Sequence, residues 1–403
     1  MCYTQNRFNA LLSACVLSLV ATASWSQSLT WLGTLPGGIG SEAEGVSADG
    51  AVVVGGSGGR AFRWENGVRQ DLGTLGGDYS RAYGVSADGA VVVGVADNAA
   101  GQRRAFRWEN GVMQDLGTLG GNESGAEGVS ADGAVVVGWA ENAAGQRRAF
   151  RWTASGGMQD LGTLGGYESG ASGVSADGAV VVGWARNAAG RSRAFRWTAS
   201  GGMQDLGTLP GGAYSYAYAV SADGAVVVGG SNNAAGRRRA FRWQNGVMQD
   251  LGTLAGGRES EAYGVSADGS VVVGWARDAA WRDRAFRWTE SGGMEDLNTT
   301  YASLLTNGPF LDWARAISPD GRYIVGRGYN AATERWRWEA FLLDTGFPLR
   351  GDVDRNGSVD GSDLLAVLSA FGGSGYRNED LNWDGTVDDA DLLQVLFNFG
   401  SGR

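Results

Sequence analysis

Short apolar and polar runs alternate along most of the chain at a nearly fixed period. One copy, residues 128–166, reads GVSADGAVVVGWAENAAGQRRAFRWTASGGMQDLGTLGG. Its run AVVVG is continuously apolar and β-branched, as expected for a strand buried on both faces. RAFRW alternates small or charged residues with aromatic ones, AYGVS precedes the turn formers ADG in other copies, and MQDLGTL precedes Gly-Gly. Each copy therefore predicts four short strands.

The spacing of the repeated words indicates a β-propeller. AFRW begins at Ala61, Ala105, Ala149, Ala194, Ala240 and Ala285, a period of 44 to 46 residues. Four strands in about 45 residues is the size of one propeller blade.

The number of words predicts how the ring closes. SADG or SPDG occurs seven times, whereas the seventh fourth-strand word is WLGTL at Trp31, before the first complete copy. An open solenoid needs polar caps, but a ring pairs its ends and removes the free sheet edges. We therefore predict an all-β, seven-bladed propeller over residues 27–345, in which residues 31–35 complete the blade of residues 314–344.

These repeats resemble a known bacterial type. The words AFRW, DLGTLGG and GVSADGAVVVG are similar to the extracellular repeats of the HAF family, over roughly residues 31–344. The His that usually precedes AF in that family is absent here. The resemblance implies a repeat architecture and no particular reaction.

Most recurring charged residues have a structural explanation. The Asp of each SADG word belongs to a tight turn, in which the following Gly takes positive φ; these are Asp49, Asp88, Asp132, Asp177, Asp223, Asp268 and Asp320. For the Asp of QDLG and the Arg of AFRW we expect an ion pair between strands, or an Arg–Trp stack, within each blade.

The loops that vary between copies predict a binding face. In a propeller the loops WAENAAGQRR and GGNESGAEG lie on one face, and variable loops on a rigid scaffold often carry function. Their aromatic rings could stack on a carbohydrate, a peptide or another cell-surface ligand; the candidates are Trp139, Trp184, Trp275, Trp281, Tyr167, Tyr214, Tyr216, Tyr263 and Trp313. The alternative is unconstrained loop variation with ordinary packing between blades.

The composition argues against most kinds of catalysis. The chain has no His and no Lys, and its two Cys residues, Cys2 and Cys15, lie close to the N-terminus. The usual general base is therefore missing, and cleavage of a signal segment near Ala23 or Ser26 would also remove both thiols. We assign no catalytic residue. The main departure from the repeat is residues 298–316, where Asp312 and Trp313 precede Glu334 and Trp336 of the next loop. An enzyme, if present, would be a glycoside hydrolase or lyase with its site there.

Two acidic stretches near the C-terminus have the spacing of EF-hand loops. Such loops present oxygen ligands at positions 1, 3, 5, 7, 9 and 12, with Gly at position 6. The first stretch supplies Asp352, Asp354, Asn356, Ser358 by its backbone carbonyl, Asp360 and Asp363; the second supplies Asp380, Asn382, Asp384, Thr386 by its carbonyl, Asp388 and Asp391. Gly357 and Gly385 occupy position 6. The pattern predicts two Ca²⁺ sites, one in each stretch.

The apolar runs DLLAVLSAFG and DLLQVLFNFG follow these loops, and position 12 is Asp in both. Paired loops of this kind resemble the type I dockerin, which implies a small α-helical domain over residues 346–403 that binds a cohesin-like protein. In that family positions 10 and 11 help to select the cohesin; here they are Gly361 and Ser362, and Asp389 and Ala390. Residues 350–403 hold ten Asp and Glu against four Arg, so two Ca²⁺ would offset four of six excess negative charges.

Residues 1–26 read as a secretory signal. One Arg is followed by an apolar run and by small residues near Ala23 and Ser26. LLSAC, ending at Cys15, also resembles a lipobox, which would give a lipid-anchored form instead. No other segment is long enough to span a membrane, and a net charge of −10 disfavours nucleic acid.

The sequence thus predicts a secreted, non-enzymatic propeller with a calcium-binding, cohesin-directed tail. Two alternatives stay open. One is an extracellular polysaccharide-degrading component with a site near the seventh-blade insertion, and the other is a purely structural cell-surface protein.

Overall fold

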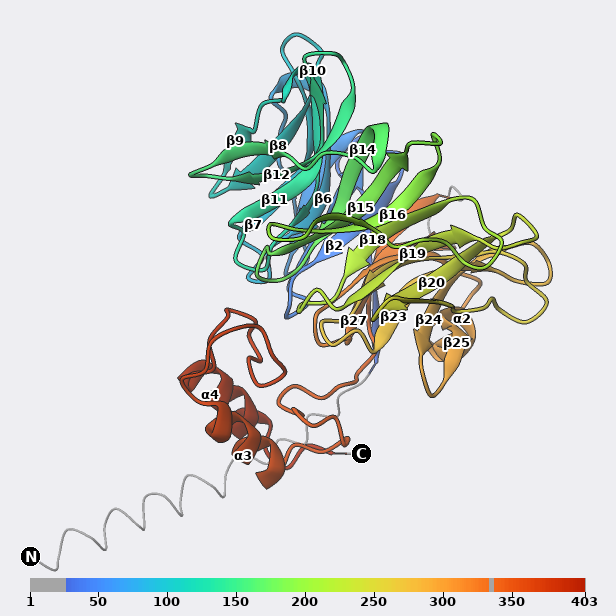
Figure 1. Ribbon diagram of the computed structural model, residues 1–403. Coiled ribbons are helices and arrows are strands. Elements are labelled where there is room, and N and C mark those ends of the chain that lie inside the picture. Colours follow the sequence, from blue (N-terminus) through green and yellow to red (C-terminus); the bar gives the residue numbers. More distant parts are fainter. Residues whose placement is uncertain (1–26, 333–336, 403) are drawn as a thin grey trace, which may run out of the picture.

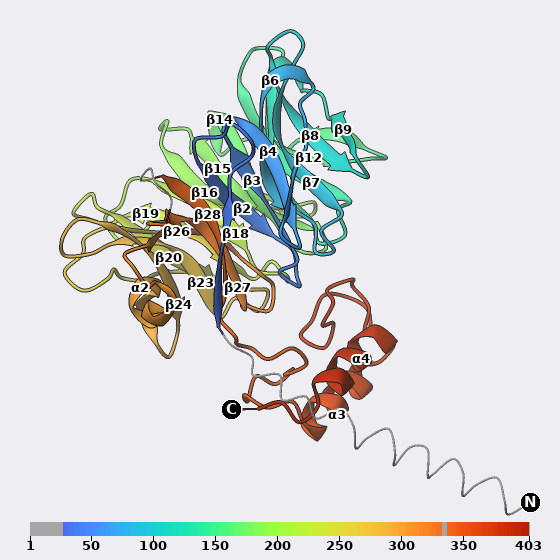
Figure 2. The same ribbon diagram turned by 180° about the vertical axis from the view of Figure 1, so that it is seen from behind.

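A ring of seven four-stranded antiparallel sheets forms the main body of the molecule (Figures 1 and 2). The computed structural model describes residues 27–332 and 337–402. The first strand of each sheet contacts the first strand of both neighbouring sheets, all the way round. The predicted seven-bladed β-propeller is therefore confirmed. The signal segment with Cys2 and Cys15, and the loop residues Glu334 and Trp336, lie outside the described residues.

The blades follow one another along the chain. Blades one to three comprise β2 (Ser41–Val46), β3 (Val52–Ser57), β4 (Arg60–Glu65) and β5 (Val68–Asp71); β6 (Gly76–Val85), β7 (Val91–Asn98), β8 (Arg103–Glu109) and β9 (Val112–Asp115); and β10 (Gly120–Val129), β11 (Val135–Asn142), β12 (Arg147–Thr153) and β13 (Gly157–Asp160). Blades four to six comprise β14 (Gly165–Val174), β15 (Val180–Asn187), β16 (Ser192–Thr198) and β17 (Gly202–Asp205); β18 (Ser215–Val220), β19 (Val226–Asn232), β20 (Arg238–Gln244) and β21 (Val247–Asp250); and β22 (Ser260–Val265), β23 (Val271–Arg277), β24 (Asp283–Thr289) and β25 (Gly293–Asp296). Blade seven comprises β26 (Phe310–Ile317), β27 (Tyr323–Tyr329), β28 (Trp338–Asp344) and β1 (Ser28–Gly33).

The N-terminal strand closes the ring, as the word count predicts. β1 pairs antiparallel with β28, with Thr30 opposite Leu342. Leu32 and Leu35 are buried in the core shared by blades seven and one. The Ser41 hydroxyl accepts the Ala340 N–H at 3.0 Å and donates to the Gly33 carbonyl at 2.5 Å. The two ends of the propeller sequence are thereby joined.

The hydrophobic core lies between blades. Phe150 of blade three packs on Val91, Val93 and Ala105 of blade two, and each of the other interfaces repeats this pattern with its own Phe. The AVVVG strands are buried on both faces because one face meets each neighbouring blade. The continuous apolar run in the sequence has this cause.

The Arg of AFRW acts mainly between blades, so its expected pairing with the QDLG Asp of the same blade is wrong. In blades one to five its Nε donates to the carbonyl of the SADG Gly in the next blade, at 3.0–3.3 Å. That carbonyl would otherwise lack a partner at the turn. The Asp of QDLG accepts the N–H of the Gly two residues later, at 2.8 Å in each of these five blades. In blades one and five it also forms the expected ion pair between strands, but with the Arg that precedes AF: Arg60 with Asp71 at 3.3 Å and Arg239 with Asp250 at 3.1 Å.

The SADG Asp residues are turn residues, as predicted. Asp132, for example, accepts the Ser130 hydroxyl at 2.5 Å and the Ala134 N–H at 2.9 Å. The second residue of six turns also donates its N–H to the equivalent carbonyl of the next blade, at 2.9–3.1 Å. The seventh equivalent is Pro319, which has no N–H to donate. We call these seven residues the alanine ring: Ala48, Ala87, Ala131, Ala176, Ala222, Ala267 and Pro319.

The C-terminal segment forms two ten-residue helices, α3 (Gly361–Ala370) and α4 (Asp389–Asn398), which pack on each other. Val359, Val367, Val387 and Val395 are fully buried in its small core. Between blades six and seven lie α2 (Leu297–Thr300) and the 3₁₀ helix η1 (Ala302–Leu304). Over residues 27–332 and 337–402, no helix combines the length and apolar character needed to cross a bilayer.

Candidate functional site

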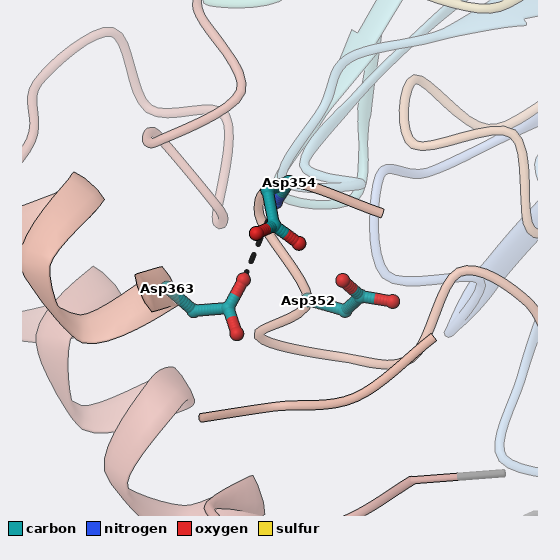
Figure 3. A group of neighbouring side chains, drawn as sticks. All are labelled: Asp352, Asp354 and Asp363. Atoms are coloured by element: carbon teal, nitrogen blue, oxygen red, sulfur yellow. Dashed lines mark hydrogen bonds between the residues drawn. The ribbon is translucent and has the colours of Figure 1, made fainter. Parts of the chain in front are cut away.

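Carboxylates converge in the first acidic loop (Figure 3). Oxygens of Asp352, Asp354 and Asp363 all lie within 4.8 Å of one another. Asp352 and Asp363 are buried, whereas Asp354 is exposed to solvent. Three negative groups held this close repel one another, so a cation among them would be strongly favoured.

Backbone hydrogen bonds fix the shape of this loop. Asp352 accepts the N–H groups of Asn356 and Gly357, both at 3.0 Å. Asp363, at 0% exposure, accepts those of Val353 at 2.7 Å and Asp360 at 2.8 Å. Gly357 has φ +92°, which a side chain would strain.

The second loop repeats this arrangement. Asp380 accepts the N–H groups of Asp384 at 3.1 Å and Gly385 at 2.9 Å. Asp391 accepts those of Leu381 at 2.6 Å and Asp388 at 2.9 Å. Burial and the neighbouring Asp391 and Asp384 carboxylates raise the pKa of Asp380 to about 6, although backbone donors act in the opposite direction. An all-oxygen donor set of this kind fits a hard cation such as Ca²⁺.

The four positions for which the sequence predicts partner contact are accessible. Gly361 and Ser362 lie in the first turn of α3, and Asp389 and Ala390 lie in the first turn of α4. All four are exposed. The two helices also expose equivalent apolar side chains, which form three pairs at matching positions of the two runs: Leu365 and Leu393, Leu368 and Leu396, and Phe371 and Phe399.

A second candidate site, which the sequence reasoning missed, lies inside the propeller. A cavity of about 740 Å³, which we call the chamber, follows the first strands around the central channel. Its wall includes Glu44, Arg81, Tyr83, Glu127, Trp139, Arg147, Trp184, Tyr216, Tyr218, Tyr263 and Arg315. Toward the SADG turns it narrows at a ring of apolar residues, the valine collar, formed by Val46, Val85, Val129, Val174, Val220, Val265 and Ile317.

Most of the predicted ligand-face aromatics belong to this channel and not to surface loops. Trp139, Trp184, Tyr216 and Tyr263 line the chamber. Trp275 and Trp313 stack on each other, with ring centres 6.2 Å apart, and Trp275 is buried. The remaining three, Tyr167, Tyr214 and Trp281, are exposed. Assigning the whole set to one loop face is therefore wrong, because the first six lie on strands that surround the channel.

Glycines opposite the tryptophans make room for the indole rings. Gly125 of β10 pairs with Trp139 of β11, and Gly170 of β14 pairs with Trp184 of β15. A Cβ atom on Gly125 or Gly170 would lie 2.7 Å or 3.0 Å from the indole nitrogen opposite. In blade five the sizes are exchanged, since Tyr216 faces Gly230. This alternation of large and small residues was the available sequence signal.

Charged side chains lie in the chamber wall and next to it. Glu42 forms ion pairs with Arg81 at 2.5 Å and Arg315 at 2.8 Å. Burial would raise the pKa of Glu42, but Arg315, Arg81 and Arg327 together hold it below its usual value. Glu127 lies in the aromatic part of the wall, where it accepts the Trp139 Nε1–H at 3.2 Å. Burial raises the pKa of Glu127 to about 7.

The seventh-blade departure does not form an open site around Asp312. This side chain is 4% exposed and forms an ion pair with Arg327 at 3.2 Å. Arg327 in turn stacks over the Trp313 ring at 3.8 Å. Burial raises the pKa of Asp312 to about 6, despite Arg327. Among the described residues, Asp312 is packed between blade seven, which supplies Arg327, and blade six, which supplies Asp283.

Comparison with known proteins does not assign the chain to a family. No protein-family model and no curated protein matches it. Among solved structures, TolB from Acinetobacter baumannii is 13% identical, with a TM-score of 0.43 over 63% of this chain and 61% of its own, so the chain spans about three fifths of that protein. An oligogalacturonate lyase in complex with manganese is 13% identical, with a TM-score of 0.48 over 80% of this chain and 94% of its own. The extracellular domain of BT4673 from B. thetaiotaomicron is 12% identical, with a TM-score of 0.49 over 80% of this chain and 40% of its own.

Proposed function

We propose that this chain is a secreted, non-enzymatic propeller protein that binds two Ca²⁺ ions through its C-terminal loops. The observation that carries the proposal is the duplicated loop. In each copy the buried Asp at position 12, Asp363 or Asp391, accepts backbone N–H groups of the loop, and the Asp at position 1 is also buried. Structured loops with preplaced oxygens lower the cost of ordering them around a metal.

The exposed apolar side chains of α3 and α4 support docking to a cohesin-like partner. The three repeated pairs described above and Phe397, which is 82% exposed, make seven exposed large apolar side chains in this short segment. Gly361, Ser362, Asp389 and Ala390 lie at the helix starts. The segment would then attach the propeller to another protein.

Calorimetric titration of residues 27–403 with Ca²⁺ tests the calcium function. We expect two sites in the wild type and one in Asp391→Asn, because that change removes a position-12 carboxylate. Glu379→Gln removes one charge just outside the ligand positions and should retain both sites. Absence of heat and of any change in melting temperature at millimolar Ca²⁺ would refute the proposal.

The chamber favours a second function, the binding of a neutral sugar. Its wall combines aromatic faces with hydroxyl, carboxylate and guanidinium groups, and its volume is within the range of small-molecule sites. Trp184 and Tyr216 both line the chamber, and their ring centres lie 6.2 Å apart at a tilt of 56°, so two aromatic side chains are close together in its wall.

Saturation-transfer NMR with a panel of neutral oligosaccharides tests this function. We expect Trp184→Ala to weaken binding about tenfold, because about 1–2 kcal/mol of stacking is lost. Trp281→Ala, which removes an exposed loop indole, is the matched control and should bind normally. Equal binding by both variants would place the sugar elsewhere, and release of products would instead favour the polysaccharide-degrading alternative.

A further inference from the structure

Both acidic loops contact the propeller through their fourth residue. Trp383 of the second loop is 6% exposed and packs against Ala48 and Ala267 of the alanine ring. Arg355 of the first loop forms an ion pair with Asp268 and donates to the Ser270 hydroxyl at 3.3 Å. Arg355 and Trp383 have φ values of +59° and +60°. This left-handed conformation is uncommon for side chains of this size, so the loop fold must hold it in place.

Trp383 closes the central channel at the SADG turns. A second cavity of about 220 Å³ lies between the valine collar and Trp383, and the alanine ring lines it. The Trp383 ring also stacks on Tyr376, with 6.4 Å between ring centres and 8° between planes. Figures 1 and 2 agree that the helical segment lies at one end of the propeller.

Charge opposes this contact when the loops hold no cation. A crevice of about 590 Å³ between the two bodies is lined by Asp49, Asp88 and Asp320 of the turns, and by Asp352 and Asp384 of the loops. Arg350 and Arg355 are the cations in the same lining. Arg350 donates to the Asp49 carbonyl at 2.7 Å, so it anchors the start of the segment. The segment itself carries ten acids and four Arg, a net charge of −6.

We propose that the SADG turns are a docking surface for the chain's own calcium loops, and that Ca²⁺ drives Trp383 into the end of the channel. The proposal rests on the calcium function above. Two ions would reduce the net charge of residues 350–403 from −6 to −2, and would hold Arg355 and Trp383 in their left-handed conformations. The chamber would then open only toward the variable loops. The exposed side chains of α3 and α4 would remain free for a partner.

Cross-linking of engineered cysteines tests the docking, since residues 27–403 contain no natural Cys. Ser270→Cys combined with Arg355→Cys should react with a short bis-maleimide at least tenfold faster in Ca²⁺ than in chelator. This pair removes the Arg355 ion pair, so its docking depends on Trp383. Adding Trp383→Ala should therefore reduce the rate to that of the control pair, Ser270→Cys with Leu365→Cys.

The outcomes separate the two proposals. Two calorimetric Ca²⁺ sites with equal cross-linking rates in Ca²⁺ and chelator would overturn docking and leave the calcium function standing. An unchanged rate on adding Trp383→Ala would overturn the role of Trp383. If the wild type binds no Ca²⁺ in the calorimetric titration, both proposals are wrong.

Discussion

Deleting residues 27–36 is expected to lower the melting temperature of the propeller by more than about 10 °C. The deletion removes β1, so β28 loses its partner and becomes an exposed edge. It also removes Leu32 and Leu35 from the core of blades seven and one, and each such loss costs about 2–5 kcal/mol. Differential scanning calorimetry measures the effect.

Two point substitutions test the same closure without deleting the strand. Leu32→Ala should destabilise the chain measurably, because Leu32 is 0% exposed, whereas Ile39→Ala, in the loop that follows β1 and 76% exposed, should have almost no effect. Closure by β1 is wrong if the deleted and full-length chains melt at the same temperature.

Phe195→Ala should reduce the free energy of unfolding by about 3–5 kcal/mol. Phe195 is fully buried and packs against Val135, Val137 and Ala149 of the preceding blade, so the change leaves a cavity at the interface. Because the interfaces are near copies, Phe106→Ala and Phe150→Ala should cost the same to within about 1 kcal/mol. Urea unfolding followed by circular dichroism gives the values.

Val112→Ala is the control for these core substitutions, since Val112 is 67% exposed and should be nearly neutral. A small loss at Phe195 together with a large loss at Phe106 would show that the blades are not energetically equivalent. That result would contradict a core built from repeated interfaces.

The first and last blades illustrate what could be predicted from words alone. WLGTL at Trp31 and the incomplete copy before Asp344 match as strand and missing strand, because four strands must pair in every blade. The acidic loops could be predicted for a similar reason. Their carboxylates are close in sequence, so spacing alone places Asp352, Asp354 and Asp363 together.

The Arg of AFRW illustrates what could not be predicted. Its partner, the turn carbonyl, belongs to the next blade, and the repeat does not reveal which face of a strand meets that blade. The chamber could not be predicted for the same reason, because the repeat does not show which side chains face the central channel. The stretch WAENAAGQRR predicts a loop that includes Trp139 and, in the next copy, Trp184, whereas both indoles extend over a glycine and line the channel.

The sequence by itself therefore determined the strands, the number of blades, the closing strand and the two acidic loops, all of which follow from local patterns and their repetition. Only the tertiary structure decided which side chains of seven different blades meet around one axis, and that Trp383 ends the channel against the alanine ring. The physical reason is that ring closure brings together residues that are one or more whole repeats apart in the chain. Their proximity depends on the curvature of the whole ring and not on any single repeat.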